Sequence, residues 1–513
     1  MSFFESLLAL LAVAVLLLQV SRRLAIPYPT MLAGAGVLLA LLPGAPQIGL
    51  DPRTALPLFV APALVDSAFD FPIAAIRSLW RPLFALAVVA VLFSAGAVAW
   101  LGVEMAGLPL YAALALGAIV APPDASAATA ILRSVRMPRR AVTVLKGESL
   151  LNDATALLLF SAALSFQQHG AISGGLALRI GIAAPGGVLL GLVLARLVRY
   201  VIPFVSGTLG GNLFEFVASF AVWIIADRLG LSAVLSLVAF AMSLARSANR
   251  IIRPRTRIHS FAVWDSAVFL LNVLAFLLMG LQARSIVGAM APQRLHAALW
   301  FAAAVIICLT LVRMAWVLLY SRVAAHIRWL RGEFEPATLR LGVLVGWCGM
   351  RGLVTLATAF ALSPDFPQRD LIVLTAFAVV LATLVVQGLT LAPLVRLLRL
   401  DRDDGSTAEL AAARAELAGA ALAALQSDTG PHADHWRYAF ETAGSAVAPA
   451  ADPASLEEWR RLGLSATRRQ REALDRLRDT QRIDSDMFLT LQAELDFSEV
   501  ALIREEERRI EES

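Results

Sequence analysis

Residues 148–153, with the sequence ESLLND, bring carboxylate, hydroxyl and amide oxygens together in an apolar part of the chain. The polar members are Glu148, Ser149, Asn152 and Asp153, and their spacing places them on one face of an α-helix. A buried carboxylate is costly in its charged form, so it favours binding either a proton or a small cation. Two ligands that compete for one site are sufficient for an exchange reaction.

A second group of candidate residues lies at 117–124, where the sequence is GAIVAPPD. Pro122 and Pro123 lack backbone N–H groups, so an apolar helix cannot continue through them and upstream carbonyls are left free. Asp124 follows at the point where a second half-helix would begin. Free carbonyls beside a carboxylate suit a monovalent cation.

The other half of the chain has a matching irregularity near Trp347 and Arg351, in a segment that contains Gly342, Gly346, Gly349 and Gly352. Interrupted apolar spans at corresponding places in two halves are typical of transporters with inverted repeats and a site at the membrane midplane. Arg351 is expected there to neutralise the C-terminal dipoles of half-helices and to pair with Glu148.

The amino-acid composition indicates which kind of secondary structure holds these residues. The 513-residue chain is 58% hydrophobic and only 16% charged, and its mean hydropathy is +0.72. These values exclude a soluble globular domain, a disordered chain, a collagen and a disulfide scaffold. Cys308 and Cys348 lie in apolar stretches and are expected to be small core residues. The fold class predicted is an all-α polytopic membrane protein.

Charged residues, prolines and glycines separate the apolar segments of the chain, which predicts about thirteen transmembrane helices. The first is expected to be a retained span rather than a signal peptide, because no basic segment precedes it. The thirteen predicted spans are 3–20, 24–42, 55–75, 83–103, 109–131, 141–163, 176–198, 213–229, 231–246, 264–282, 297–320, 339–362 and 371–398.

The net charge of +5 conceals two unlike regions. Residues 1–400 contain 15 acidic and 30 basic residues, whereas residues 401–513 contain 24 acidic and 14 basic residues. We therefore expect a transmembrane domain at 1–400 and a helical cytosolic tail at 401–513. The basic residues lie between spans, so they indicate membrane topology rather than nucleic-acid binding.

Arginines concentrate after odd-numbered spans, as with Arg77 and Arg81 or Arg246 and Arg250. Connections after even-numbered spans contain few arginines, for example Arg228. By the positive-inside rule the odd connections are cytoplasmic, so the N-terminus is outside and the C-terminus inside a cell (inner) membrane.

Charged residues at membrane depth are functional candidates because each is costly to insert. For Glu215 and Arg313 taken alone, a structural ion pair or a polar contact between helices is the favoured interpretation. The deep charges are Asp66, Asp124, Glu148, Asp153, Glu215, Arg313 and Arg351.

These motifs together resemble the NhaP and eukaryotic NHE-type family of monovalent cation:proton antiporters, the sodium/hydrogen exchangers. The closest matches are residues 147–153, residues 117–124, and residues 346–352 with the sequence GWCGMRG. Weaker matches are Asp66, Ser232, Asn272 with Gly280, Arg313, and residues 387–390. The resemblance covers the third to the thirteenth span and does not extend to the tail.

The resemblance implies a homodimer with dimerisation helices and a mobile core that works by elevator-like alternating access. It implies that Asp153 carries the cation and the proton, and that Asp124, Ser149 and Asp66 complete the coordination. Glu148 would pair with Arg351, and Asn152 would hold the crossing broken helices. The partners implied are monovalent cations, protons and the lipid bilayer, with no cofactor.

Two details bear on stoichiometry and ion choice. Within the family the Asn-Asp form, here Asn152 and Asp153, accompanies electroneutral exchange of one cation for one proton. Pro123 stands where the family usually has Thr, so a hydroxyl ligand is lost. Ser126, or a carbonyl freed at Val120 or Ala121, could replace it. Sodium is expected, with lithium or potassium as alternatives.

Three other functions compete with antiport. An organic-anion carrier on the same scaffold should have a basic midplane, whereas this midplane is acidic. A channel needs a filter of repeated carbonyls or a symmetric charged ring, and the sequence contains no such loop. An ion-sensing membrane protein would signal through the tail, which has no recognisable catalytic or nucleotide-binding motif. Without a nucleophile and base pair, the chain is not expected to be an enzyme.

Overall fold

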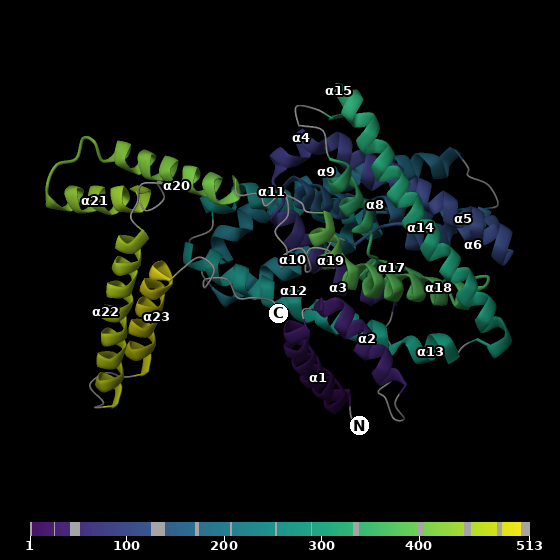
Figure 1. Cartoon of the computed structure of the whole chain (residues 1–513), viewed down its shortest axis with the longest axis horizontal. Coiled ribbons are helices and arrows are strands. Elements are labelled where there is room, and N and C mark those ends of the chain that lie inside the picture. The colour runs from purple at the N-terminus through teal and green to yellow at the C-terminus, as the bar shows by residue number, and fades with distance from the viewer. Residues whose placement is uncertain are drawn as a thin grey trace. The chain divides into compact units, whose positions relative to one another are not determined.

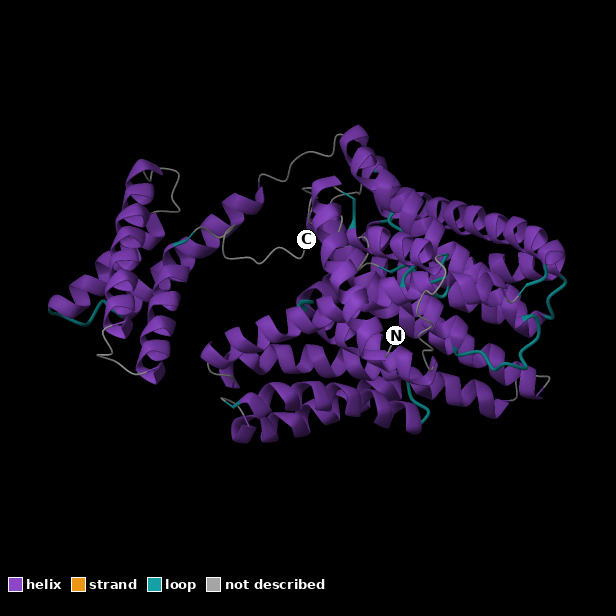
Figure 2. Ribbon diagram, turned by 90° about the horizontal axis from the view of Figure 1, so that it is seen from below, coloured by secondary structure: helices purple, strands orange, loops and turns teal. Residues whose placement is uncertain are grey.

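The computed structural model describes residues 3–24, 26–41, 52–124, 139–169, 174–205, 208–251, 254–288, 290–331, 338–398, 405–445, 453–479 and 485–503. Within these ranges the secondary structure is helical, and Figure 2 shows helices and loops without strands in the described part. The all-helical fold class predicted from composition is confirmed.

The chain forms two compact units, residues 1–402 and residues 403–512. Most helices of the first unit are labelled in Figure 1. In chain order the described helices of this unit are α1 (Phe3–Leu24), α2 (Tyr28–Ala40), α3 (Pro52–Phe69), α4 (Ile73–Phe84), the π-helix η1 (Ala85–Ala90), α5 (Val91–Ala106), α6 (Leu110–Val120), α8 (Arg139–His169), α9 (Gly174–Val205), α10 (Leu209–Arg228), α11 (Ala233–Ile251), α12 (Pro254–Leu281), α13 (Ala283–Gly288), α14 (Pro292–His326), α15 (Arg328–Arg331), α16 (Leu339–Trp347), α17 (Leu353–Phe360), α18 (Arg369–Ala382), the π-helix η2 (Thr383–Gln387) and α19 (Gly388–Leu398).

The second unit consists of two helical hairpins (Figure 1). The helix α20 (Gly405–Ala424) packs beside α21 (Pro431–Ser445), and α22 (Pro453–Asp479) packs beside α23 (Ser485–Leu502). Arg471 of α22 joins the second hairpin through side-chain contacts to Asp496 and Glu499 of α23. These hydrogen bonds raise the pKa of Arg471, so the guanidinium stays charged.

All thirteen predicted spans overlap helices of the first unit. Among the described residues, seven helical stretches are long and apolar enough to cross a membrane, and four shorter apolar helices overlap other predicted spans. The seven are Ile73–Ala106, Ala141–Gln167, Gly181–Val205, Gly210–Arg228, Thr256–Gly288, Arg294–His326 and Arg369–Leu398. The chain is therefore a multi-pass membrane protein.

Local sequence explains where several helices begin and end. The Thr208 and Thr338 hydroxyls accept hydrogen bonds from Gly211 N and Leu341 N, both at 3.3 Å, and thereby cap α10 and α16. The helix α5 ends at Gly107, whose φ of 61° is left-handed and favours glycine.

Glycines allow a very close helix contact between α2 and α12. A methyl group added at Gly36 would lie 2.5 Å from Leu277 O, and one added at Gly280 would overlap Ala33 O. The two backbones therefore touch directly, as small residues allow in membrane helix pairs. Gly34, also on α2, has no atom within 4 Å of its added methyl group.

A buried ion pair links α8 to α14. Arg313 Nη1 lies 2.5 Å from Glu148 Oε1, and Nη2 lies 3.0 Å from Glu148 Oε2. Arg313 Nη2 also donates to Val345 O of α16 at 3.2 Å, so this single guanidinium connects three helices. The pair is bidentate, with exposed fractions of 3% for Arg313 and 1% for Glu148. The structural interpretation of Arg313 is confirmed.

We predict that Gly36→Ala destabilises the protein, because α2 and α12 must separate to admit a methyl group. The cost should be about 1–3 kcal/mol. Thermal unfolding in detergent should show a lower midpoint for Gly36→Ala, while Gly34→Ala stays near wild type. Equal midpoints for both variants would contradict the packing described.

We also predict that Glu148→Met strongly destabilises the fold, since it leaves the Arg313 charge buried without its partner. Breaking a buried pair costs about 3–5 kcal/mol, whereas replacing both members by apolar residues is often neutral. The double variant Glu148→Met/Arg313→Met should thus be more stable than the single variant. Thermal unfolding of both purified variants tests this, and simply additive losses would refute it.

Candidate functional site

The two interrupted spans predicted from the sequence contact each other. The helix α6 ends at Val120, before Pro122 and Pro123, and residues 348–352 separate α16 from α17. Asp124 N donates to Met350 O at 2.6 Å, which joins the two interruptions directly. A methyl group at Gly352 would overlap Asp124 Oδ2, so only glycine admits this carboxylate. The half-helix predicted after Asp124 lies outside the described residues.

The Arg351 guanidinium donates to three backbone carbonyls at the interruptions. Its Nε donates to Val120 O at 3.1 Å, its Nη2 to Ala121 O at 3.5 Å, and its Nη1 to Gly349 O. The guanidinium is 1% exposed and lies at the C-terminus of α6, where a cation stabilises the helix dipole. The two carbonyls considered as replacement cation ligands, those of Val120 and Ala121, are therefore hydrogen-bonded to Arg351.

The predicted pair between Glu148 and Arg351 is wrong. Arg313 binds both oxygens of Glu148, whereas the hydrogen bonds of Arg351 go to backbone carbonyls. The physical reason is geometric: a planar guanidinium matches a carboxylate in two parallel hydrogen bonds, and Arg313 on α14 provides that geometry. Sequence spacing placed both arginines at membrane depth but did not distinguish their partners.

Asn152 and Asp153 of α8 face the first interruption. Asn152 Nδ2 donates to Pro123 O at 2.6 Å, and the Asn152 side chain is fully buried. Its amide oxygen is also buried and forms no hydrogen bond to the described part of the chain. Pro123 thus contributes a carbonyl that anchors α8, not a free oxygen. Ser126, the other replacement ligand considered, lies outside the described residues.

Asp153 is the buried carboxylate at the centre of this arrangement. It is 7% exposed, and the charge of Asp124 acts on it electrostatically. Ser149 precedes Asp153 by one helical turn on the same face of α8 and is half-buried. The structure therefore brings Asp124 and Asp153 near each other, with the hydroxyl of Ser149 on the face that carries Asp153. Two such carboxylates can share one cation or one proton.

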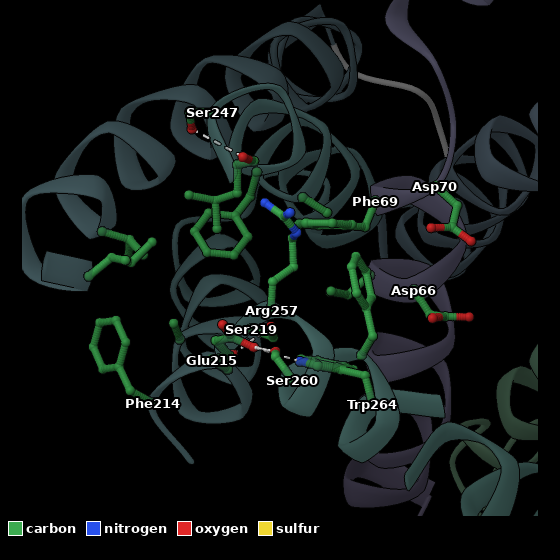
Figure 3. Close-up of a pocket in the computed structure, with 18 residues that line it drawn as sticks. Asp66, Phe69, Asp70, Phe214, Glu215, Ser219, Ser247, Arg257, Ser260 and Trp264 are labelled. Carbon is green, nitrogen blue, oxygen red and sulfur yellow. Dashed lines mark hydrogen bonds between the residues drawn. The ribbon is translucent and has the colours of Figure 1, made fainter. Parts of the chain in front are cut away.

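Asp66 lies apart from these residues in sequence and belongs to α3. It is half-buried and lines a cavity of about 80 Å³ between α3 and the helices α9 to α12. Figure 3 shows the Asp66 and Asp70 carboxylates directed away from the cluster around Glu215.

Glu215 of α10 forms a polar contact between helices. It accepts hydrogen bonds from Ser260 Oγ and, at 3.0 Å, from Trp264 Nε1, both on α12 (Figure 3). The indole of Trp264 in turn stacks on Phe216, with ring centroids 4.1 Å apart. The structural interpretation of Glu215 is therefore confirmed.

Sequence reasoning missed the contribution of the last span. Thr383 begins the π-helix η2, and its hydroxyl accepts a hydrogen bond from Arg351 N at 3.1 Å. The same hydroxyl donates to Val379 O at 2.8 Å. Thr383 is 2% exposed and holds the second interruption in place. The only signal was a polar residue at the depth of the interruptions, and one Thr among apolar residues is weak information.

Comparison with known proteins agrees with this geometry. Residues 8–397 match the family described as "Sodium/hydrogen exchanger, transmembrane". An uncharacterized Na(+)/H(+) exchanger of Mycobacterium tuberculosis is 32% identical over 97% of this chain and 96% of its own length. A sodium, potassium, lithium and rubidium/H(+) antiporter of Bacillus pumilus is 29% identical over 76% of this chain and 61% of its length.

The fold is likewise that of a solved structure. The sodium proton antiporter MjNhaP1 of Methanocaldococcus jannaschii superposes with a TM-score of 0.61 at 17% identity. The match covers 78% of this chain and 99% of that protein. The family match spans the interrupted helices, the buried carboxylates and the buried arginines alike. The chain belongs to the sodium/hydrogen exchanger family of cation/proton antiporters.

Proposed function

We propose that this protein is a secondary active antiporter that exchanges one monovalent cation for one proton across the cell membrane. The observation that carries the proposal is the buried Asp153 beside Asp124, at the point where two interrupted spans meet. A carboxylate in this position binds a proton or a cation but not both, and a gradient of one ion then drives the other.

Asp153 is the proposed carrier, and Asp124, Ser149 and Asp66 are the proposed additional ligands. Asn152, Glu148, Arg351 and Pro123 have structural roles at the site through the contacts described above. The transported cation is the substrate, so no resident cofactor is proposed.

The charges around the interruptions support a one-to-one stoichiometry. The buried or half-buried charged groups of this region are four carboxylates, Asp66, Asp124, Glu148 and Asp153, and three cations, Lys146, Arg313 and Arg351. Their sum is one negative charge, which either one proton or one monovalent cation neutralises. The proton-loaded site and the cation-loaded site are then both neutral, so neither form places a net charge in the apolar interior.

Sodium is the proposed principal cation, with lithium and potassium as alternatives. Relatives are named both as Na(+)/H(+) exchangers and as a sodium, potassium, lithium and rubidium/H(+) antiporter, which supports this range. Pro123 supplies no hydroxyl, and its carbonyl is bonded to Asn152. A site with fewer strong oxygen ligands favours a large cation with a low hydration cost, and that is the specific argument for potassium.

The remaining features of the proposal follow the family resemblance and the arginine pattern. They are thirteen spans with inverted repeats, a homodimer with dimerisation helices and a mobile core in residues 1–400, elevator-like alternating access, and a cytosolic tail at 401–513. The arginines of the odd-numbered connections support a location in the inner membrane with the N-terminus outside.

We predict that Asp153→Asn abolishes exchange, because an amide neither binds a proton at working pH nor carries the charge that attracts a cation. Purified protein in liposomes with a pH-sensitive dye should show proton movement when sodium, lithium or potassium is added. The variant should give the background rate of protein-free liposomes while its thermal unfolding stays cooperative.

Ser161→Ala is a matched control for that experiment, since Ser161 lies two turns further along α8 and its exposed hydroxyl donates to Leu157 O of the same helix. It should retain wild-type exchange. Full transport by Asp153→Asn would show that another group is the carrier. Absence of flux from folded wild-type protein with all three cations would favour an organic-anion carrier or an ion sensor instead.

We predict that membrane potential does not drive sodium/proton exchange by this protein. Moving one net charge per cycle across 100 mV is worth about 2.3 kcal/mol, which would shift the equilibrium sodium ratio about fiftyfold. For electroneutral exchange the ratio should not change. The potential is set with a potassium gradient and valinomycin, and the same gradient without valinomycin controls for potassium transport. An equilibrium sodium ratio that changes with membrane potential would exclude exchange of one cation for one proton.

A further inference from the structure

The π-helix η2 connects two parts of the first unit that are far apart in sequence. The hydroxyl of Thr30, in the first turn of α2, donates to Leu384 O at 2.8 Å. The preceding residue, Thr383, faces the second interruption, where its hydroxyl accepts from Arg351 N at 3.1 Å. Both threonines are buried, so these hydrogen bonds lie in a low-dielectric interior that strengthens them. Two consecutive residues of η2 therefore link α2 to the peptide at Arg351.

Packing against α12 holds Thr30 in place independently of η2. The ring centroid of Tyr28, two residues before Thr30, lies 5.6 Å from that of Phe269 and 6.5 Å from that of Phe276, both edge-on and both on α12. Further along α2, Gly36 touches the α12 backbone directly. The position of the Thr30 hydroxyl is therefore set by α12.

The Thr30 hydroxyl completes the hydrogen bonding of Leu384 O. The donor that follows η2, Gly388 N–H, is shared between Leu384 O and Val385 O, so Leu384 O receives only part of a hydrogen bond from its own helix. The external donor thus stabilises the π register against the competing α register. A return to the α register would turn Thr383 by about 100° relative to α19 and withdraw its hydroxyl from the interruption.

The peptide at Arg351, which η2 holds, also positions Asp124. On one side of Arg351, Met350 O accepts from Asp124 N at 2.6 Å. On the other side, Gly352 lies so close to the Asp124 carboxylate that an added methyl group would overlap it. A movement of this peptide therefore moves Asp124, whose charge acts on the proposed carrier Asp153.

We infer that Thr30 is a positioning residue for ion binding: through η2 it fixes the interruption that presents Asp124 to the transported cation. The inference rests on the proposed antiport. Thr30 does not touch the ion in this arrangement, and its hydroxyl acts by keeping the site in its binding-competent form. When a site is competent only part of the time, its apparent affinity falls with the competent fraction, whereas a saturating ion restores the full rate. Loss of this hydroxyl should therefore raise KM and leave Vmax unchanged.

The test compares Thr30→Val, which keeps the side-chain shape but removes the donor, with Thr30→Ser, which keeps the donor. Exchange is measured in liposomes with whichever of sodium, lithium and potassium the wild type exchanges fastest. Thr30→Val should raise the apparent KM about tenfold, the factor that corresponds to one lost buried hydrogen bond. Thr30→Ser should restore the wild-type KM. A role in folding alone would instead lower the amount of active protein, and hence Vmax, at an unchanged KM.

Thr375→Val is the matched control. Thr375 is a fully buried threonine of α18, and its hydroxyl donates to Leu371 O of its own helix at 2.7 Å. The variant also loses a buried donor, but it breaks no link between helices, so its KM should equal that of the wild type. An equal rise of KM in Thr375→Val, or in Thr30→Ser, would overturn the inference.

Thr383→Val tests the route through η2. If Thr30 acts through Thr383, the double variant Thr30→Val/Thr383→Val should have the KM of Thr383→Val alone. KM increases that multiply in the double variant would show that the two residues act independently and would overturn the inference. A wild-type KM for Thr30→Val, or a fall in Vmax alone, would overturn it too and leave the antiport intact. Folded wild-type protein without cation-coupled proton flux would refute the antiport itself.

Discussion

A backbone carbonyl at membrane depth has no water to bond with, and this constraint governs the centre of the molecule. Two spans are interrupted there, by Pro122 and Pro123 in one case and by Gly349 and Gly352 in the other. The carbonyls that these interruptions release are bonded by donors from elsewhere, above all the Arg351 guanidinium and the Asn152 amide. Without these donors an interrupted span would be too costly to insert, and no site could form around Asp153.

The two buried arginines, Arg313 and Arg351, have different roles because their hydrogen-bond partners differ. Arg351 faces carbonyls, so its charge is balanced by helix dipoles, whereas Arg313 faces the carboxylate of Glu148. Glu148 is thereby removed from ion binding although it adjoins the polar face of α8. Asp153, the proposed carrier, has no such bidentate cationic partner among the described residues. A competition between proton and cation requires this difference.

The sequence was sufficient to predict the helical membrane fold, the two interruptions and the residues gathered around them, because proline, glycine and charge are rare and costly inside apolar spans. It was not sufficient to choose between Arg313 and Arg351 as the partner of Glu148. That choice depends on which helix presents its guanidinium face to the carboxylate, which is a property of packing. Thr383 went unnoticed for a related reason, since its partner is the backbone N–H of Arg351 on another helix.

The two π-helices extend the rule about unpaired carbonyls beyond the interruptions. A π-helix changes the hydrogen-bond register, which leaves carbonyls without their usual partners. In η1, Ala85 O accepts from Trp316 Nε1 at 2.9 Å, and in η2, Leu384 O accepts from the Thr30 hydroxyl at 2.8 Å. Each donor is separated by more than 200 residues from its acceptor. In both cases the role of an isolated Thr or Trp in an apolar span is to donate a hydrogen bond to a π-helix carbonyl on another helix, so its own helix does not explain it.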